Sequence, residues 1–198
     1  FSYSANNQIT GSITRLGSTT LSTTSYEIGL DGQARAASQT DALSGAITTF
    51  SYGANNQVTG SSTKRNGVTL STASYEIGLD GQARIHAQTD TLSGNITTFA
   101  YDSVNQVQSS QTANAANVVL STSLYELGVD GRARIASQTD ALTQNVTSFT
   151  YDAKNQLKTS QTANSASQQI LSTTSYEIGV DGQARAASQT DALSGAIT

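Results

Sequence analysis

Residues 26–35 read Tyr-Glu-Ile-Gly-Leu-Asp-Gly-Gln-Ala-Arg (YEIGLDGQAR), and this stretch decides the fold. It returns unchanged from Tyr75, as YELGVDGRAR from Tyr125, and as YEIGVDGQAR from Tyr176. Within every copy an Arg follows the Glu after eight residues. Self-similarity of this kind is the signature of array proteins, in which each unit contacts its neighbours. The chain is therefore interpreted as a repeat array.

The repeats are about 50 residues long, and each divides into two half-repeats of about 25 residues. We predict one continuous array of four repeats, 1–49, 50–98, 99–148 and 149–198, which is interpreted as a segment of a longer chain. The first half carries the pattern F-x-Y-x-x-x-N-Q and the second carries Y-x-[IL]-G-x-D-G-[QR]-A. The leading aromatic of each half-repeat is predicted to form a row, made of Phe1, Tyr26, Phe50, Tyr75, Phe99, Tyr125, Phe149 and Tyr176.

The motif predicts a β-hairpin with a short loop. Alternating apolar and polar residues flank Leu30-Asp31-Gly32 on both sides, which is the strand signal. Three-residue hairpin loops end in a residue with positive φ, a conformation that Gly and Asn tolerate best. Every half-repeat has one of these residues there: Asn7, Gly32, Asn56, Gly81, Asn105, Gly131, Asn155 and Gly182. The expected fold is all-β, a repetitive antiparallel hairpin array with about four strands per repeat in a spiral or solenoid-like sheet.

The loop length sets a register that explains the recurring Glu and Arg. It places Tyr26 opposite Ala36, with Ala36 and Ser38 on one face, and it sets a Glu directly across from an Arg on the other face. A cross-strand ion pair of this kind contributes about 0.2–1 kcal/mol and favours the correct register. The predicted structural ion pairs are Glu27–Arg35, Glu76–Arg84, Glu126–Arg134 and Glu177–Arg185.

A single half-repeat has too few large apolar residues to fold alone. Ordering each residue costs about 1–2 kcal/mol, whereas each buried large apolar side chain returns about 1.5–3 kcal/mol. We therefore expect neighbouring units to bury one another's apolar side chains. The aromatic row should occupy one face and Ser and Thr the other.

The composition argues against catalysis and against metal binding by cysteine or histidine. The chain has no Cys and one histidine, His86, whose equivalents in the other copies are alanines, so neither a catalytic triad nor a zinc site is expected. We predict no enzyme activity and no cofactor. Calcium at turn aspartates such as Asp31 and Asp41, and glycosylation at Asn95 and Asn145, stay open as alternatives. The net charge of −4 disfavours nucleic acid, and no apolar run is long enough to span a membrane.

Two segments resemble a known repeat family. Residues 101–107 (YDSVNQV) and 151–157 (YDAKNQL) resemble the YD repeat, roughly Y-D-x-x-G-R-[LV], and Gly131-Arg132 reproduces its Gly-Arg pair. YD repeats occur in Rhs-like toxins, bacterial wall-associated proteins and teneurins. The resemblance implies hairpins wound into a spiral sheet that can close into a hollow shell, with carbohydrate binding in some members. Here Asn replaces the family's Gly at Asn56 and Asn105, and Gln stands where Arg is usual.

The sequence thus favours a structural protein: a bacterial extracellular β-rich fibre, filament or cell-surface stalk. The expected partner is another copy or a continuation of the same array, with polysaccharide as a further possibility. The alternative is a carbohydrate-binding or shell segment of a YD-repeat toxin or adhesin.

Overall fold

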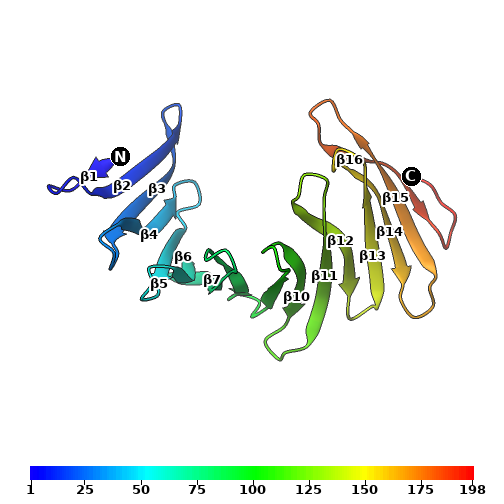
Figure 1. Cartoon of the computed structure of the whole chain (residues 1–198). Coiled ribbons are helices and arrows are strands. Elements are labelled where there is room, and N and C mark those ends of the chain that lie inside the picture. Colours follow the sequence, from blue (N-terminus) through cyan, green and yellow to red (C-terminus); the bar gives the residue numbers. More distant parts are fainter. The chain divides into compact units, whose positions relative to one another are not determined.

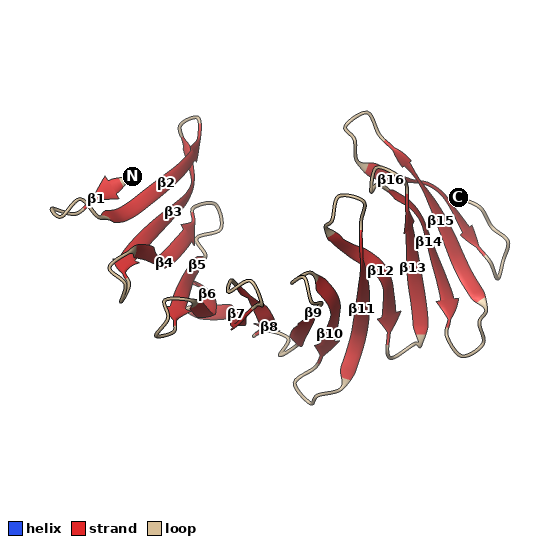
Figure 2. Ribbon diagram, viewed as in Figure 1, coloured by secondary structure: helices blue, strands red, loops and turns tan.

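A computed structural model describes residues 1–198 as an all-β protein with sixteen antiparallel strands, which confirms the predicted fold class (Figures 1 and 2). None of its elements is a helix that could cross a membrane. The strands are β1 (Ser2–Tyr3), β2 (Ile9–Leu16), β3 (Thr19–Ile28), β4 (Ala34–Asp41), β5 (Ile47–Tyr52), β6 (Val58–Arg65), β7 (Val68–Ile77), β8 (Ala83–Asp90), β9 (Ile96–Tyr101), β10 (Val107–Ala113), β11 (Val119–Leu127), β12 (Ala133–Asp140), β13 (Asn145–Tyr151), β14 (Leu157–Asn164), β15 (Ile170–Ile178) and β16 (Ala184–Asp191).

The chain forms two compact units, Phe1–Ile96 and Thr97–Thr198. Within each unit the strands form a single-layer meander in which the order in the sheet follows the order in the sequence. β9 begins at the last residue of the first unit and continues into the second. The division into four sequence repeats stays a prediction.

The hairpin loops have the conformation that their sequence favours. All four loop asparagines have φ between 60° and 64°, and all four loop glycines have φ between 74° and 77°. In the loop after β3, the Gly29 N–H donates to the Gln33 carbonyl at 2.8 Å, and the Gly32 N–H donates to the Gly29 carbonyl at 3.0 Å. Because the two bonds recur in every such hairpin of the YEIGLDGQAR type, the loop fixes the strand register next to it.

Next to the loop the register follows the sequence prediction: Glu27 pairs with Arg35 and Tyr26 with Ala36. Farther from the loop, beyond Tyr26, a β-bulge shifts the register by one residue. Ser25 pairs with Ser38, so Ala37 has no partner on β3. The prediction that Ala36 and Ser38 share a face is therefore wrong, because a bulge adds one residue to one strand and reverses its alternation. Instead the Ser25 and Ser38 hydroxyls are 2.8 Å apart.

The sheet lacks a buried apolar core. No hydrophobic side chain is fully buried, and the buried residues are Ser110, Ser123 and Ser160 together with Gly29, Gly78 and Gly128. The expectation that neighbouring units would bury their apolar side chains is thus wrong, since a single layer leaves both faces open to water. Aromatic residues instead alternate with serine: Phe149 pairs with Ser160 across β13 and β14, and the Ser160 hydroxyl is 3.2 Å from that of Tyr176.

Aspartates close the turns at the opposite end of the hairpins. The Asp41 carboxylate accepts hydrogen bonds from the main-chain N–H groups of Leu43 at 2.8 Å and Ser44 at 2.9 Å. Both hydrogen bonds stabilise the ionised carboxylate, so they hold the pKa of Asp41 below its usual value. The bond from the Ser44 N–H has the larger effect. The pKa values of Asp90, Asp140 and Asp191 in the equivalent turns are lowered in the same way, mainly by the main-chain N–H of Ser93, Thr143 and Ser194 respectively.

These aspartates predict acid sensitivity. Because their pKa is lower in the folded state than in the unfolded state, they stabilise the fold above the unfolded value of about 4 and lose that contribution as the pH falls through the folded values. We expect the melting temperature, followed by far-UV circular dichroism, to be flat between pH 7 and pH 5 and to fall steadily below pH 4. Asp41→Asn should flatten part of that fall. A melting temperature that is constant down to pH 2.5 would contradict this account.

Candidate functional site: a joint between hairpins

The sheet has one weak seam in each unit where the main-chain ladder is short. β4 pairs with β5 only through Ser38, Gln39 and Thr40, so residues 34–37 have no ladder partner on that side. β12 pairs with β13 only through residues 137–140. Unpaired main-chain groups between strands are costly unless side chains or water satisfy them, so side chains are expected to fill this gap.

Two residues of the following hairpin bridge this gap. The Tyr52 hydroxyl donates a hydrogen bond of 2.6 Å to the main-chain carbonyl of Ala36, which lies in the unpaired part of β4. The side-chain oxygen of Asn56 accepts a hydrogen bond of 3.0 Å from the main-chain N–H of Leu30 at the tip of the preceding hairpin. Side chains therefore supply the cross-strand bonds that the short ladder omits.

Arg35 connects the two hairpins. Its Nε donates to Glu27 Oε1 at 2.8 Å, and its Nη1 donates to the Asn56 side-chain oxygen at 2.6 Å. The guanidinium carbon lies 4.2 Å from the centre of the Tyr52 ring. Stacking of this kind contributes about 0.5–2 kcal/mol, depending on how much water is excluded. We call Glu27, Arg35, Tyr52 and Asn56 the joint.

The second unit repeats this arrangement with Glu126, Arg134, Tyr151 and Asn155. Arg134 donates to Glu126 at 2.9 Å and to Asn155 at 2.5 Å, and it lies 4.2 Å from the centre of the Tyr151 ring. The Tyr151 hydroxyl donates to the Ile135 carbonyl at 2.7 Å, and the Val129 N–H donates to Asn155 at 3.0 Å. The joint is thus a reproducible geometry and not an accident of one turn.

The joint is partly shielded from water. The Arg35 and Arg134 side chains are 23% and 22% exposed. Burial raises the pKa of Tyr52 and of Tyr151, and the nearby arginine opposes that shift only in part. Both phenols are therefore kept protonated, which is the form that donates to the main-chain carbonyl.

A glycine leaves room for the bridging amide. A Cβ atom at Gly29 would lie 2.9 Å from the Asn56 side-chain oxygen, and one at Gly128 would lie 2.7 Å from that of Asn155. Real Cβ contacts are longer than this. The same Cβ at Gly29 would also lie 2.9 Å from Asp31 Oδ1, so a larger residue would crowd both the bridging amide and the aspartate of its own loop. Its own conformation does not require glycine, because its φ is not in the left-handed region.

The predicted ion pairs fall into two groups. Glu27–Arg35, Glu76–Arg84 and Glu126–Arg134 are formed, with nitrogen–oxygen distances of 2.8–2.9 Å. The fourth prediction is wrong: Glu177 and Arg185 lie opposite each other in the register, but Arg185 pairs with Asp181 at 2.8 Å. The Arg185 side chain is 59% exposed, against 23% for Arg35. A Glu opposite the Arg is therefore not sufficient to position it.

His86 occupies the bulge position of β8, the equivalent of Ala37. The bulge brings its Nδ1 to 3.1 Å from Glu76 Oε2, so this carboxylate contacts both His86 and Arg84. No three His, Asp or Glu side chains gather as a metal site would require.

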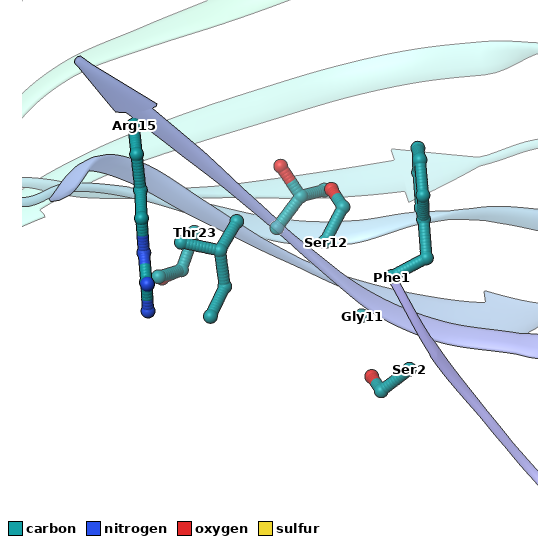
Figure 3. A pocket seen from close by; sticks show the side chains of 8 residues that line it. Phe1, Ser2, Gly11, Ser12, Arg15 and Thr23 are labelled. Carbon is teal, nitrogen blue, oxygen red and sulfur yellow. The ribbon is translucent and has the colours of Figure 1, made fainter. Parts of the chain in front are cut away.

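Shallow hollows line the sheet. Polar ones of about 310 and 400 Å³ occupy equivalent places, one lined by Ser22, Gln39, Asp41 and Thr48, the other by their counterparts in the second unit, residues 121, 138, 140 and 147. Another, of about 540 Å³, lies over β1, β2 and β3, with Phe1 at one end and Arg15 at the other (Figure 3).

Sequence reasoning assigned the Glu, the Arg and the loop asparagines but missed that Asn56 and Tyr52 belong to the Arg35 site. The signal was present as a spacing: Asn56 follows Arg35 by 21 residues, and Asn155 follows Arg134 by the same 21. Contacts over this distance depend on how two hairpins pack, which motif periodicity alone does not report.

Comparison with known proteins places the fold. No protein-family model matches the sequence, and no curated protein matches it. The fold is similar to a chain of the Tc holotoxin pore of Photorhabdus luminescens, with 18% identity and a TM-score of 0.52, over 89% of this chain and 9% of that one. It is also similar to TcdB2-TccC3, with 16% identity and a TM-score of 0.50, over 93% of this chain and 12% of that one.

These similarities show that the chain shares its all-β fold with parts of these Tc toxin chains. At such low identity they show the fold alone. The chain spans about a tenth of the length of the chains that it matches.

Proposed function

We propose that this chain is a structural repeat segment of an extracellular, bacterial β-rich fibre or surface stalk. Its role would be mechanical rather than catalytic. The observation that carries the proposal is the joint, which connects consecutive hairpins by the same contacts in both units. A contact that depends only on the next hairpin can be repeated without limit, as in other one-dimensional arrays.

Polar surfaces support the same role. Because the sheet has a single layer with no buried apolar residue, its stability rests on main-chain ladders and side-chain bonds between strands rather than on a compact core. Such a structure can grow in length without needing a wider core. Its exposed Ser and Thr would keep a fibre hydrated outside the cell.

Electron microscopy tests this function. We expect the intact protein in negative stain to show elongated fibres, and aligned fibres to give the main-chain reflection near 4.7–4.8 Å that strand spacing produces. Isolated globular particles from the intact protein, with no elongated species, would contradict the fibre.

The second candidate is a shell or carbohydrate-binding segment of a YD-repeat toxin or adhesin. Fold similarity to the two Tc toxin chains favours a shell wall, and the resemblance of residues 101–107 and 151–157 to the YD repeat supports a divergent member of that family. The repeated polar hollows are where a saccharide would bind. Limited proteolysis of the intact protein distinguishes the two candidates. A segment that is cut only after the sheet is denatured would be enclosed cargo, which would favour the shell over the fibre.

A further inference from the structure

We propose that one edge of the sheet in the first unit is a docking surface for the same edge of a second copy of this chain, related to it by a two-fold axis. The edge consists of the four turns β2–β3, β4–β5, β6–β7 and β8–β9. Because consecutive strands run in opposite directions, these turns lie on one side of the meander and the loops of the YEIGLDGQAR type lie on the other (Figure 2). We call this side the turn edge. The inference goes beyond the proposed function, since it applies equally to a fibre and to a shell.

Charge alternates along the turn edge. The four turns carry, in order, a base, an acid, two bases and an acid: Arg15, Asp41, Lys64 with Arg65, and Asp90. All of these side chains are exposed, and none of the three bases forms an ion pair within the chain. Neighbouring turns are two strands apart, which corresponds to about 9–10 Å. The turn edge therefore presents unpaired charges of alternating sign at a regular spacing.

The two acids of the turn edge are ionised and fixed in position. Oδ1 of Asp90 accepts hydrogen bonds from the main-chain N–H groups of Leu92 and Ser93, each at 2.9 Å. Asp41 has the same bonds in its own turn, and in both turns they lower the pKa of the aspartate. Because the main-chain bonds use Oδ1, Oδ2 of each carboxylate can face a cation from outside the chain.

The turn edge is complementary to itself. Reversing the order of its four turns exchanges the signs, which is what a two-fold axis between the second and third turns does. Asp41 of one copy then faces Lys64 and Arg65 of the other. The outer turns place Arg15 against Asp90. Every pair occurs twice in such a contact, as in other two-fold interfaces.

Each of the four turns also exposes a large apolar side chain beside its charge. The exposed fractions are 74% for Leu16, 75% for Leu43, 54% for Val68 and 74% for Leu92. The two-fold arrangement brings Leu43 against Val68 and Leu16 against Leu92. Apolar side chains surrounded by charged ones are the usual composition of a protein–protein contact, in which the apolar groups supply affinity and the charges set the register.

The other edges of the chain lack this pattern. In the second unit the turns at 113–119 and 164–170 contain no basic residue, so the equivalent edge carries only Asp140 and Asp191. On the opposite side of the first unit the loops carry Asp31 and Asp80 with no base between them. Like charges would face each other if either edge met its own copy. The self-complementary pattern is therefore specific to the turn edge.

Two variants test the docking, each reversing one half of the central contact. Lys64→Glu with Arg65→Glu replaces the bases, and Asp41→Asn with Ala42→Lys replaces the acid while an amide oxygen still closes the turn. In sedimentation velocity at low salt, we expect the natural chain to form a dimer and each variant alone to associate at least tenfold more weakly. An equal mixture of the two variants should dimerise again, because each then faces the opposite charge. Raising sodium chloride from about 50 to about 500 mM should weaken the natural dimer.

Asp140→Asn with Ala141→Lys is the matched control, since it makes the same change in the equivalent turn of the second unit. It should leave dimerisation unchanged, and all variants should keep the circular dichroism spectrum of the natural chain. If this control weakens association and the Asp41 variant does not, the bases of the first unit bind the acidic edge of the second, and the two-fold docking is overturned. It is also overturned if the natural chain stays monomeric at millimolar concentration, or if the mixed variants do not dimerise.

Discussion

Replacing Tyr52 or Tyr151 with alanine should lower the free energy of unfolding by about 2–3 kcal/mol. Each substitution removes the ring beneath an arginine and the hydroxyl that satisfies a main-chain carbonyl in the unpaired part of β4 or β12. Loss of the stacking contributes about 0.5–2 kcal/mol, and the unsatisfied carbonyl about 1–3 kcal/mol, part of which water recovers at this partly exposed site. Urea unfolding followed by circular dichroism gives the global value.

Hydrogen exchange locates the effect. The Leu30 N–H, which donates to Asn56 across the seam, should lose protection in Tyr52→Ala, while amides in the long β2–β3 ladder should keep theirs. Tyr52→Phe keeps the ring and removes only the hydroxyl, and should cost about 1 kcal/mol. Tyr3→Ala is the control, because Tyr3 has the same place in its hairpin but no arginine beneath it. An equal loss in Tyr3→Ala would mean that the tyrosine acts within its own hairpin.

Asn155→Gly should also be strongly destabilising, by about 1.5–3 kcal/mol, although its φ of 63° would ordinarily favour glycine. The substitution removes the oxygen that accepts from Arg134 and from the Val129 N–H, and hydrogen bonds to charged groups are worth about 1.5–3 kcal/mol. Asn155→Asp keeps an acceptor next to the guanidinium and should retain most of the stability.

A second asparagine provides the contrast. Asn117 has a φ of 62° in the turn between β10 and β11, its side chain is exposed, and it bridges no hairpin. Asn117→Gly should therefore leave stability unchanged or raise it slightly. The two substitutions have the same backbone chemistry and opposite expected results, so differential scanning calorimetry of the pair decides the role of the amide. Equal melting temperatures for both variants would exclude a bridging role for Asn155.

The parts of the fold that the sequence predicts are those that depend on a single hairpin. Gly32 and Asn56 mark loops because few other residues tolerate a positive φ. The loop length then places Glu27 opposite Arg35, whichever strands lie on either side of the hairpin. Local stereochemistry determines both features. The Asp41 turn belongs to the same group, because its carboxylate bonds to the main chain two and three residues later.

The parts that it does not predict depend on relations between hairpins. The bulge occurs at Ala37, His86, Ala136 and Ala187, and neither Ala nor His is a residue type that marks a bulge. The seam opens because β4 and β5 pair over a short stretch, and only then does Tyr52 reach Ala36.

The joint draws its Glu and Arg from one repeat and its Tyr and Asn from the next, so it straddles the sequence boundary between them. Duplication or loss of part of the array changes the length of the protein. It leaves every seam intact only when the duplicated or lost segment is a whole number of repeats of about 50 residues. Loss of a single half-repeat would place a hairpin with a loop glycine after the arginine. That seam would lack the asparagine amide that accepts a hydrogen bond from the guanidinium. Selection on this one contact would keep the copy number free to vary while holding the length of each copy nearly constant.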